Sequence, residues 1–185
     1  MKYNIILADC PWHYSKINIR MYSGASYPTM SLQEIKDLPI QKIADKDCAL
    51  FLWATYPKLP EAFEVIDAWN FKYITNAFTW IKLNPKAKNI FSGLGFWTNS
   101  NAEICLFAKK GKPKRKDKTI KQIVMANRGR HSAKPPEVRD RIVKLMGDLP
   151  RIELFAREQT EGWDAIGNEI DNKDIRVALR EIYET

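Results

Sequence analysis

The chain has 185 residues, of which 45% are hydrophobic and 28% charged, and its formal net charge is +8. This length suits one ordinary domain with its own core, so we predict a single domain over residues 1–185. No apolar stretch approaches the ~20 residues of a membrane-spanning helix, and the start lacks a secretory cleavage site, so we expect a cytoplasmic protein. The positive charge fits a polyanionic partner such as nucleic acid, although many basic proteins bind nothing acidic.

The first half of the chain alternates expected strands and helices. Residues 3–8 (YNIILA) form a short apolar run typical of a strand buried on both faces. Ser31 and Glu34 form a capping box that opens a helix, and Pro39 closes it. A strand over 48–53, a helix over 57–69 and a strand over 73–81 then indicate a β-α-β unit. The expected apolar face of its helix consists of Leu59, Ala62, Phe63, Ile66 and Trp69.

The second half continues the alternation. A long loop is expected over residues 84–98, a strand over 103–108 and a strongly basic surface loop over 109–118. After a strand at 122–125, Pro135 is expected at the first position of a helix that ends at Gly147. Further elements are expected at 151–155, 163–166 and 174–183. This order predicts an α/β fold with a mostly parallel sheet covered on both faces, in which ligands collect at the carboxyl ends of strands.

Cysteine and histidine are too dispersed to signal a metal centre. No two of the three cysteines form a C-x-x-C pair, and the two histidines lie far apart in the chain. The sequence therefore predicts neither a disulfide framework nor a zinc site, and we expect no metal.

The strongest local motif is the tetrapeptide Asp9, Cys10, Pro11 and Trp12 at the end of the first strand. Taken alone, an acid and a proline after a strand often only make a turn. The same groups also suit the amine of adenine, a poor nucleophile whose hydrogens must be held by acceptors. Asp9 supplies one acceptor, and Pro11 keeps the Cys10 carbonyl extended as a second. Trp12 would stack on the base, and we take all four residues as candidate catalytic residues.

Many motifs in one order resemble the MT-A-seventy family of adenine N6-methyltransferases, whose eukaryotic members methylate mRNA and whose bacterial and phage members modify DNA. The motifs are ADCPW at 8–12, YPTMSLQEIKDLP at 27–39, LFLWAT at 50–55, FSGLGFWTNSNAEICLFAKKG at 91–111, HSAKPPE at 131–137, IELFAR at 152–157 and GWDAIGNE at 162–169. The resemblance covers nearly the whole chain. It implies a Rossmann-like methyltransferase fold with permuted motif order, in which the catalytic tetrapeptide comes early and the cofactor-binding strand late.

The resemblance also implies that S-adenosylmethionine is the cofactor. Asn168 and Glu169 would hydrogen-bond its ribose, Phe155 would line the adenosine pocket, and Arg157 or Lys134 would pair with the methionine carboxylate or with acidic neighbours. The complete cofactor set implied in this way is Asp9, Lys134, Glu153, Phe155, Arg157, Gln159, Thr160, Asn168 and Glu169.

Loops and basic residues provide the candidate contacts to the substrate. Aromatic residues would flank the target base by resemblance, although such residues also pack on domain surfaces. The basic run and two later arginines are a candidate phosphate track, although charge runs are often only solvated. The candidate substrate-binding residues are Trp12, Tyr22, Tyr27, Trp97, Asn99, Lys112, Lys114, Arg115, Arg128 and Arg130.

Two positions depart from the family pattern. Cys10 stands where the family tetrapeptide DPPW has its first proline, and because only a backbone carbonyl is needed there, we expect activity to survive. Asn99 stands where relatives often carry arginine, which bears on contacts to the target strand.

Three functions stay open at the level of sequence. DNA adenine N6-methylation is favoured. The expected partners are nucleic acid and either a second copy of this chain or a partner subunit. An RNA methyltransferase with the same chemistry is the first alternative, because groove geometry and the 2′-hydroxyl separate the two only by experiment. A catalytically silent binding subunit is the second alternative. The retention of Asp9, Trp12 and the GNE segment argues against it.

Overall fold

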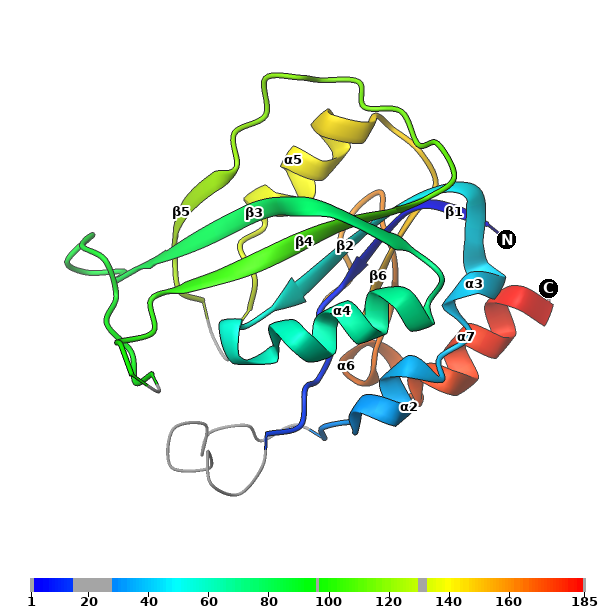
Figure 1. Ribbon diagram of the computed structural model, residues 1–185, viewed down its shortest axis with the longest axis horizontal. Helices are drawn as coiled ribbons and strands as arrows, with labels where there is room; N and C mark the ends of the chain where they lie inside the picture. Colours follow the sequence, from blue (N-terminus) through cyan, green and yellow to red (C-terminus); the bar gives the residue numbers. More distant parts are fainter. Residues whose placement is uncertain (1, 15–27, 96, 130–132, 185) are drawn as a thin grey trace.

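The computed structural model describes residues 2–14, 28–95, 97–129 and 133–184 (Figure 1). Its centre is a seven-stranded sheet with the strand order β5-β3-β4-β2-β1-β6-β7. The strands are β1 (Tyr3–Ala8), β2 (Ala44–Ala54), β3 (Lys72–Leu83), β4 (Ala102–Lys110), β5 (Ile123–Asn127), β6 (Arg151–Leu154) and β7 (Asp164–Ile166).

Strand direction decides which residues meet at each edge of the sheet. β1 pairs in parallel with β2 and β6, β3 with β5, and β6 with β7, whereas β4 pairs antiparallel with β2 and β3. The prediction of a mostly parallel sheet is therefore confirmed, with β4 reversed. One edge holds the carboxyl end of β1 and of every strand parallel to it, together with the amino end of β4. We call this end of the strands the carboxyl edge of the sheet, and the opposite end of the strands the amino edge.

The reversal of β4 follows from the connection that precedes it. A parallel return requires a long crossover, usually a helix, whereas an antiparallel return does not. The described part of this connection, residues 84–95 and 97–101, contains no helix. The expected β-α-β unit is present as β2, α4 and β3, but β4 lies between its two strands.

Helices cover both faces of the sheet, as predicted (Figure 1). The described helices are α2 (Leu32–Lys36), α3 (Ile40–Ile43), η2 (Tyr56–Lys58), α4 (Leu59–Ala68), α5 (Glu137–Met146), α6 (Asn168–Asp171) and α7 (Ile175–Glu184). On one face α2, α3, α4 and α7 pack with Ile6 and Leu52 into one apolar core. On the other face α5 packs with Leu7 and Trp53 into a second core. Alternate residues of the same strands therefore stabilise opposite layers.

Local sequence rules explain several helix ends and fail at others. The capping box is confirmed: the Ser31 side chain accepts a hydrogen bond from the Glu34 backbone, and the Glu34 side chain accepts one from Ser31 N–H. Gly147 ends α5 with φ of 95°. Pro135 does not start that helix, which begins at Glu137 after an N-cap at residue 136. Phe63 is 38% exposed rather than buried, and its ring packs edge-on against Tyr73.

Two further findings concern membrane spans and metal sites among the described residues. None of the helices is both long and apolar enough to cross a membrane. Within the same residues, no group of three or more His, Cys, Asp or Glu side chains is arranged to hold a metal ion.

Candidate active site

The tetrapeptide follows β1 at the carboxyl edge, and β1 is an inner strand of the sheet, between β2 and β6. Ala8 pairs with Leu52 of β2 and with Leu154 of β6, so the chain after β1 emerges between two parallel neighbours. Trp12 N–H donates to the Cys10 carbonyl at 2.9 Å, which closes a tight turn around Pro11. The Cys10 oxygen therefore uses one of its two lone pairs within the turn and keeps the other.

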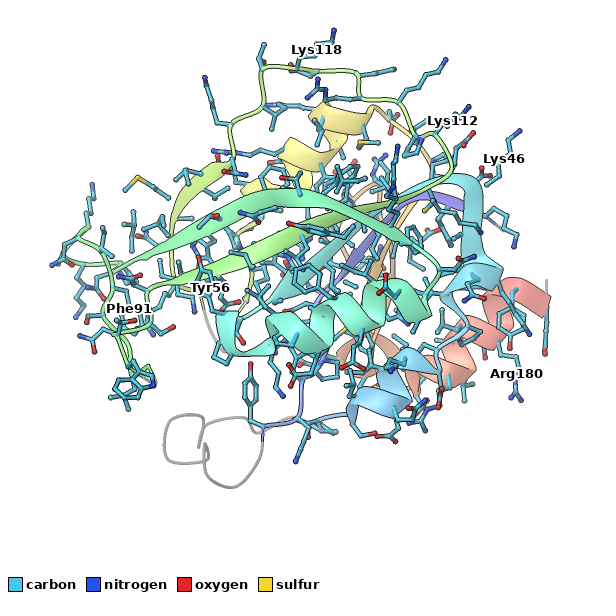
Figure 2. All side chains as sticks on the ribbon, viewed as in Figure 1. Lys46, Tyr56, Phe91, Lys112, Lys118 and Arg180 are labelled. Carbon is cyan, nitrogen blue, oxygen red and sulfur yellow. The ribbon has the colours of Figure 1, made fainter. Side chains whose placement is uncertain are left out.

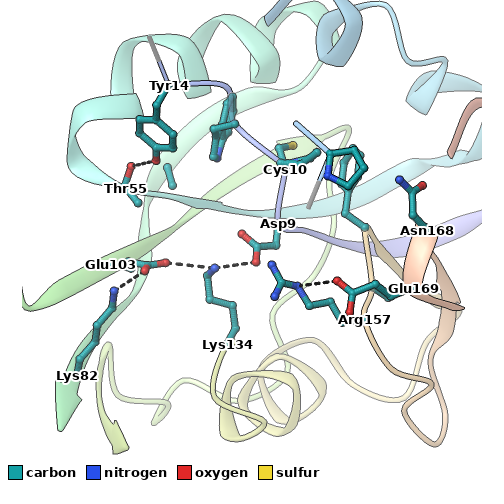
Figure 3. A pocket seen from close by; sticks show the side chains of 16 residues that line it. Asp9, Cys10, Tyr14, Thr55, Lys82, Glu103, Lys134, Arg157, Asn168 and Glu169 are labelled. Atoms are coloured by element: carbon teal, nitrogen blue, oxygen red, sulfur yellow. Dashed lines mark hydrogen bonds and ion pairs between the residues drawn. The ribbon is translucent and has the colours of Figure 1, made fainter. Parts of the chain in front are cut away.

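A chain of alternating charges starts at Asp9 (Figure 3). Lys134 Nζ lies 2.7 Å from Oδ2 of Asp9 and 3.2 Å from Oε2 of Glu103, and Lys82 Nζ lies 2.5 Å from Oε1 of Glu103. These side chains are largely buried, Glu103 being 6% exposed. Two ammonium groups and two carboxylates thus compensate one another at the base of the site.

The ion pairs determine the protonation of this cluster. Burial alone would lower the pKa of Lys134, but the carboxylates of Asp9 and Glu103 raise it well above its ordinary value. Burial would raise the pKa of Glu103, but the ammonium groups of Lys134 and Lys82 outweigh burial and lower it. Lys134 therefore stays positively charged at neutral pH and fixes one oxygen of Asp9. Cys10 is different, because burial and the nearby Asp9 raise the pKa of its thiol, which stays protonated.

The carboxyl end of β6 provides the second half of the site. Phe155 has a left-handed backbone with φ of 60°, a strained conformation for a non-glycine residue and one that clusters at functional sites. Arg157 Nε then lies 3.6 Å from Oε1 of Glu169. Gly167 makes this approach possible, since a Cβ there would lie 2.3 Å from the Ala156 carbonyl oxygen.

The two halves enclose one pocket of about 240 Å³. A second, wider hollow lies beside it, and Trp12 and Tyr14 line both. The lining of the pocket (Figure 3) is Asp9, Cys10, Pro11, Trp12, Tyr14, Pro28, Ala54, Thr55, Lys82, Glu103, Lys134, Phe155, Ala156, Arg157, Asn168 and Glu169.

A family model described as MT-A70 matches residues 3–169, which is most of the chain. The chain belongs to the MT-A70 family. The resemblance carried by the sequence motifs is thereby confirmed, and the α/β fold described above agrees with it.

Individual MT-A70 relatives differ in length. The chain is 36% identical over 198 residues to the type II methyltransferase M.MunI of a Mycoplasma species, covering 95% of this chain and 81% of that protein. It is 26% identical to the N(6)-adenosine-methyltransferase MT-A70-like of Arabidopsis thaliana, covering 98% of this chain and 26% of that protein. It is 28% identical to the human N(6)-adenosine-methyltransferase catalytic subunit METTL3, covering 92% of this chain and 28% of that protein.

The fold brings nine of the twelve candidate catalytic and cofactor residues to the pocket. These are Asp9, Cys10, Pro11, Trp12, Lys134, Phe155, Arg157, Asn168 and Glu169.

Three candidate cofactor residues do not line the pocket. The Glu153 carboxylate pairs with Arg139 of α5 at 2.6 Å, on the face of the sheet that α5 covers. Gln159 donates a hydrogen bond to the Trp163 carbonyl at 2.6 Å, and the Thr160 carbonyl accepts one from Trp163 N–H at 3.1 Å. Gln159 and Thr160 therefore belong to the turn between β6 and β7, whereas Glu153 lies within β6.

The candidate substrate residues are dispersed. Trp97 is fully exposed and lines the second hollow. Asn99 is exposed on the loop between β3 and β4, and Arg128, at the same edge, lies 3.5 Å from the centre of the Phe91 ring. Candidates outside the described residues are Tyr22, Tyr27 and Arg130.

The basic candidates Lys112, Lys114 and Arg115 lie at the amino edge. β4 runs antiparallel, so its last residue, Lys110, pairs with Cys48 near the start of β2. The chain that follows β4 therefore begins at the edge opposite to the pocket, and the fold does not bring these cations to Asp9.

Sequence reasoning missed Lys82 and Glu103 as parts of the site. A usable signal was present, since Lys82 follows the apolar and aromatic residues Trp80 and Ile81, and Glu103 precedes the apolar run 104–108, where an unpaired charge is costly. Tyr14 and Thr55 were also missed, and their hydroxyl oxygens lie 2.7 Å apart at the pocket wall.

Proposed function

We propose that this chain transfers a methyl group from S-adenosylmethionine to the exocyclic N6 amine of adenine in DNA. The observation that carries the proposal is the juxtaposition of two unlike clusters at one edge of the sheet. Asp9, held by Lys134 beside Trp12, is an acceptor next to a flat aromatic surface. Arg157, Asn168 and Glu169 line the adjoining wall with groups that suit a charged nucleoside.

The donor and acceptor types fit S-adenosylmethionine. A carboxylate and an amide at Glu169 and Asn168 suit vicinal ribose hydroxyls, and the Arg157 guanidinium suits a carboxylate. Phe155 lines the same wall and offers an apolar surface for a nucleobase. The cofactor would supply a methyl group on a sulfonium that needs no further activation.

The residues around Asp9 suit the acceptor amine. Lys134 bonds Oδ2 of Asp9, and among the described residues no donor is bonded to Oδ1. That oxygen and the remaining lone pair of the Cys10 carbonyl would accept the two amine hydrogens, which favours the pyramidal, more nucleophilic nitrogen. After transfer the nitrogen carries an excess proton, which leaves to water or by way of Asp9.

The choice of N6 and of DNA rests on the relatives. The eukaryotic relatives carry the name N(6)-adenosine-methyltransferase, which supports the N6 amine as acceptor. The chain matches those proteins over about a quarter of their length, but it matches 81% of the bacterial M.MunI. Because identity and coverage are both higher for this type II methyltransferase than for the N(6)-adenosine-methyltransferases, DNA is favoured over RNA. A second copy or a partner subunit would complete the surface that reads the sequence.

The test is transfer of labelled methyl from S-adenosylmethionine to matched single- and double-stranded DNA and RNA, followed by nucleoside analysis. We expect label in N6-methyladenine from DNA. Label in RNA alone would select the RNA methyltransferase. No label in any polymer, with S-adenosylmethionine binding intact, would contradict the proposal and select the silent binding subunit.

A further inference from the structure

A basic loop, defined as residues 111–121, crosses the amino edge of the sheet between β4 and β5. Along β2, the register runs from Cys48 opposite Lys110 to Ala54 opposite Ile104. Six residues of extended strand correspond to ~20 Å, so about that distance separates the start of this loop from the edge that holds Asp9. In Figure 1 the connection from β4 to β5 passes over α5, on the side of the molecule away from α2 and α6.

The backbone of the basic loop is fixed to the domain at several points. Lys112 N–H donates to the Asp47 side chain at 2.7 Å, and Lys116 N–H donates to the Leu145 carbonyl at 2.8 Å. Gly111 has φ of 65°, and a Cβ there would lie 2.2 Å from the Lys46 carbonyl oxygen. The Asp117 side chain accepts two hydrogen bonds from Thr119. The loop is therefore a built part of the surface and not a loose charged run.

The cations of the basic loop point outward. Lys112, Lys114, Arg115 and Lys118 are exposed, and within the described part of the chain none of these side chains forms a salt bridge. Figure 2 shows Lys112 and Lys118 directed away from the body of the molecule, with Lys46 projecting from the start of β2 nearby. Cations that form no salt bridge within the protein are available to an external polyanion.

We propose that the basic loop is a second DNA-binding surface, which holds the phosphate backbone at a distance from the adenine that enters the pocket. This inference rests on the proposed function and extends it. Since the loop offers cations without an apolar or aromatic reading surface, its binding is independent of sequence and strongly dependent on salt. A straight duplex needs ~6 base pairs to span ~20 Å, and more to follow the surface, so only longer DNA reaches both places.

The test compares the wild type with a Lys112→Ala, Lys114→Ala and Arg115→Ala triple variant. Binding of mixed-sequence duplexes of 6 and 30 base pairs is measured by fluorescence anisotropy over a range of KCl concentrations. For the 30-base-pair duplex we expect the variant to bind at least tenfold more weakly and its slope of log affinity against log salt to fall by ~2 to 3, because up to three phosphate contacts are lost. Binding of the 6-base-pair duplex should change much less.

A matched control removes three charges from α7 and its approach, through Lys173→Ala, Arg176→Ala and Arg180→Ala. Each of these cations already pairs with an acidic side chain, so the salt slope should stay near that of the wild type. An unchanged slope in the basic-loop variant, or an equal loss with both duplex lengths, would overturn the proposal. The single change Lys114→Glu repeats the test without touching the backbone anchors. Because binding is measured without turnover, failure of the proposed methyl transfer leaves this result independent.

Discussion

Glu103 links the two lysines of the site, and its ionisation should contribute to stability. The fold lowers the pKa of Glu103 from its ordinary value of 4.5. A carboxyl group with a lowered pKa stabilises the folded state at pH values above 4.5, and this contribution is lost as the pH falls through the lowered pKa. We expect Glu103→Gln to lower the free energy of unfolding by about 3 kcal/mol at pH 7, since one partner of a buried ion pair is removed. As the pH falls below 4.5 and through the lowered pKa, this difference should shrink, because the wild type loses the same charge.

Urea unfolding across that pH range is the measurement for Glu103. Glu64→Gln is the control, since the Lys36–Glu64 pair is more exposed, with side chains 27% and 52% accessible, and should contribute at most about 1 kcal/mol. A difference between wild type and Glu103→Gln that stays constant with pH would show that the loss comes from packing and not from charge.

Cys10 tests whether the tetrapeptide acts through its backbone. Its thiol is protonated and buried, and among the described residues its N–H donates no hydrogen bond to another backbone group, so a proline there would break none. We expect Cys10→Pro to keep methyl transfer within about threefold of the wild type and to change stability by less than about 1 kcal/mol. Steady-state rates and thermal unfolding measure both quantities. A large loss of activity in a folded variant would assign a role to the thiol.

At the level of elements, Gly167 controls how closely β7 and α6 approach the end of β6. A Cβ at this position would lie 2.3 Å from the Ala156 carbonyl oxygen and 2.7 Å from its nitrogen, so Gly167→Ala must push the segment carrying Asn168 and Glu169 outward. We expect S-adenosylmethionine to bind at least ~10-fold more weakly, since a displacement of this size disrupts positioned hydrogen bonds.

Isothermal titration of the cofactor is the measurement for Gly167. Gly129→Ala is the control, because a Cβ there meets nothing nearer than 3.4 Å. Equal affinities of wild type and Gly167→Ala for S-adenosylmethionine would show that Asn168 and Glu169 do not bind the cofactor.

Elements with a local physical signal could be predicted from the sequence. The capping box of Ser31 and Glu34, the glycine at 147 and the apolar run of β1 are each decided within a few residues. The short helix α3 and the direction of β4 could not be predicted in this way, because tertiary packing and the path of a loop decide them.

At the scale of the whole molecule, the direction of β4 changes the interpretation of the charge. The sequence predicts one phosphate track that combines the basic run with Arg128 and Arg130. The reversed strand carries that run to the amino edge, whereas Arg128 lies at the carboxyl edge. Most of the pocket was predictable because its residues follow strand ends. The cluster of Lys82, Glu103 and Lys134 joins three distant segments of the chain, so it could be recognised only in the folded structure. The extent of the single domain stays a prediction.

The most direct test of the proposed function measures methyl transfer and cofactor binding in the same samples of wild type and Asp9→Asn. The substitution keeps the size of the side chain but removes its charge, so the acceptor for the amine is weakened while Arg157, Asn168 and Glu169 are untouched. We predict a single-turnover rate of N6-methyladenine formation at least ~100-fold lower, consistent with the loss of an electrostatic group acting on the transition state, and a Kd for S-adenosylmethionine within about threefold of the wild type. An equal loss of cofactor affinity and rate, or an unchanged rate, would contradict the assignment of Asp9 to the reacting amine.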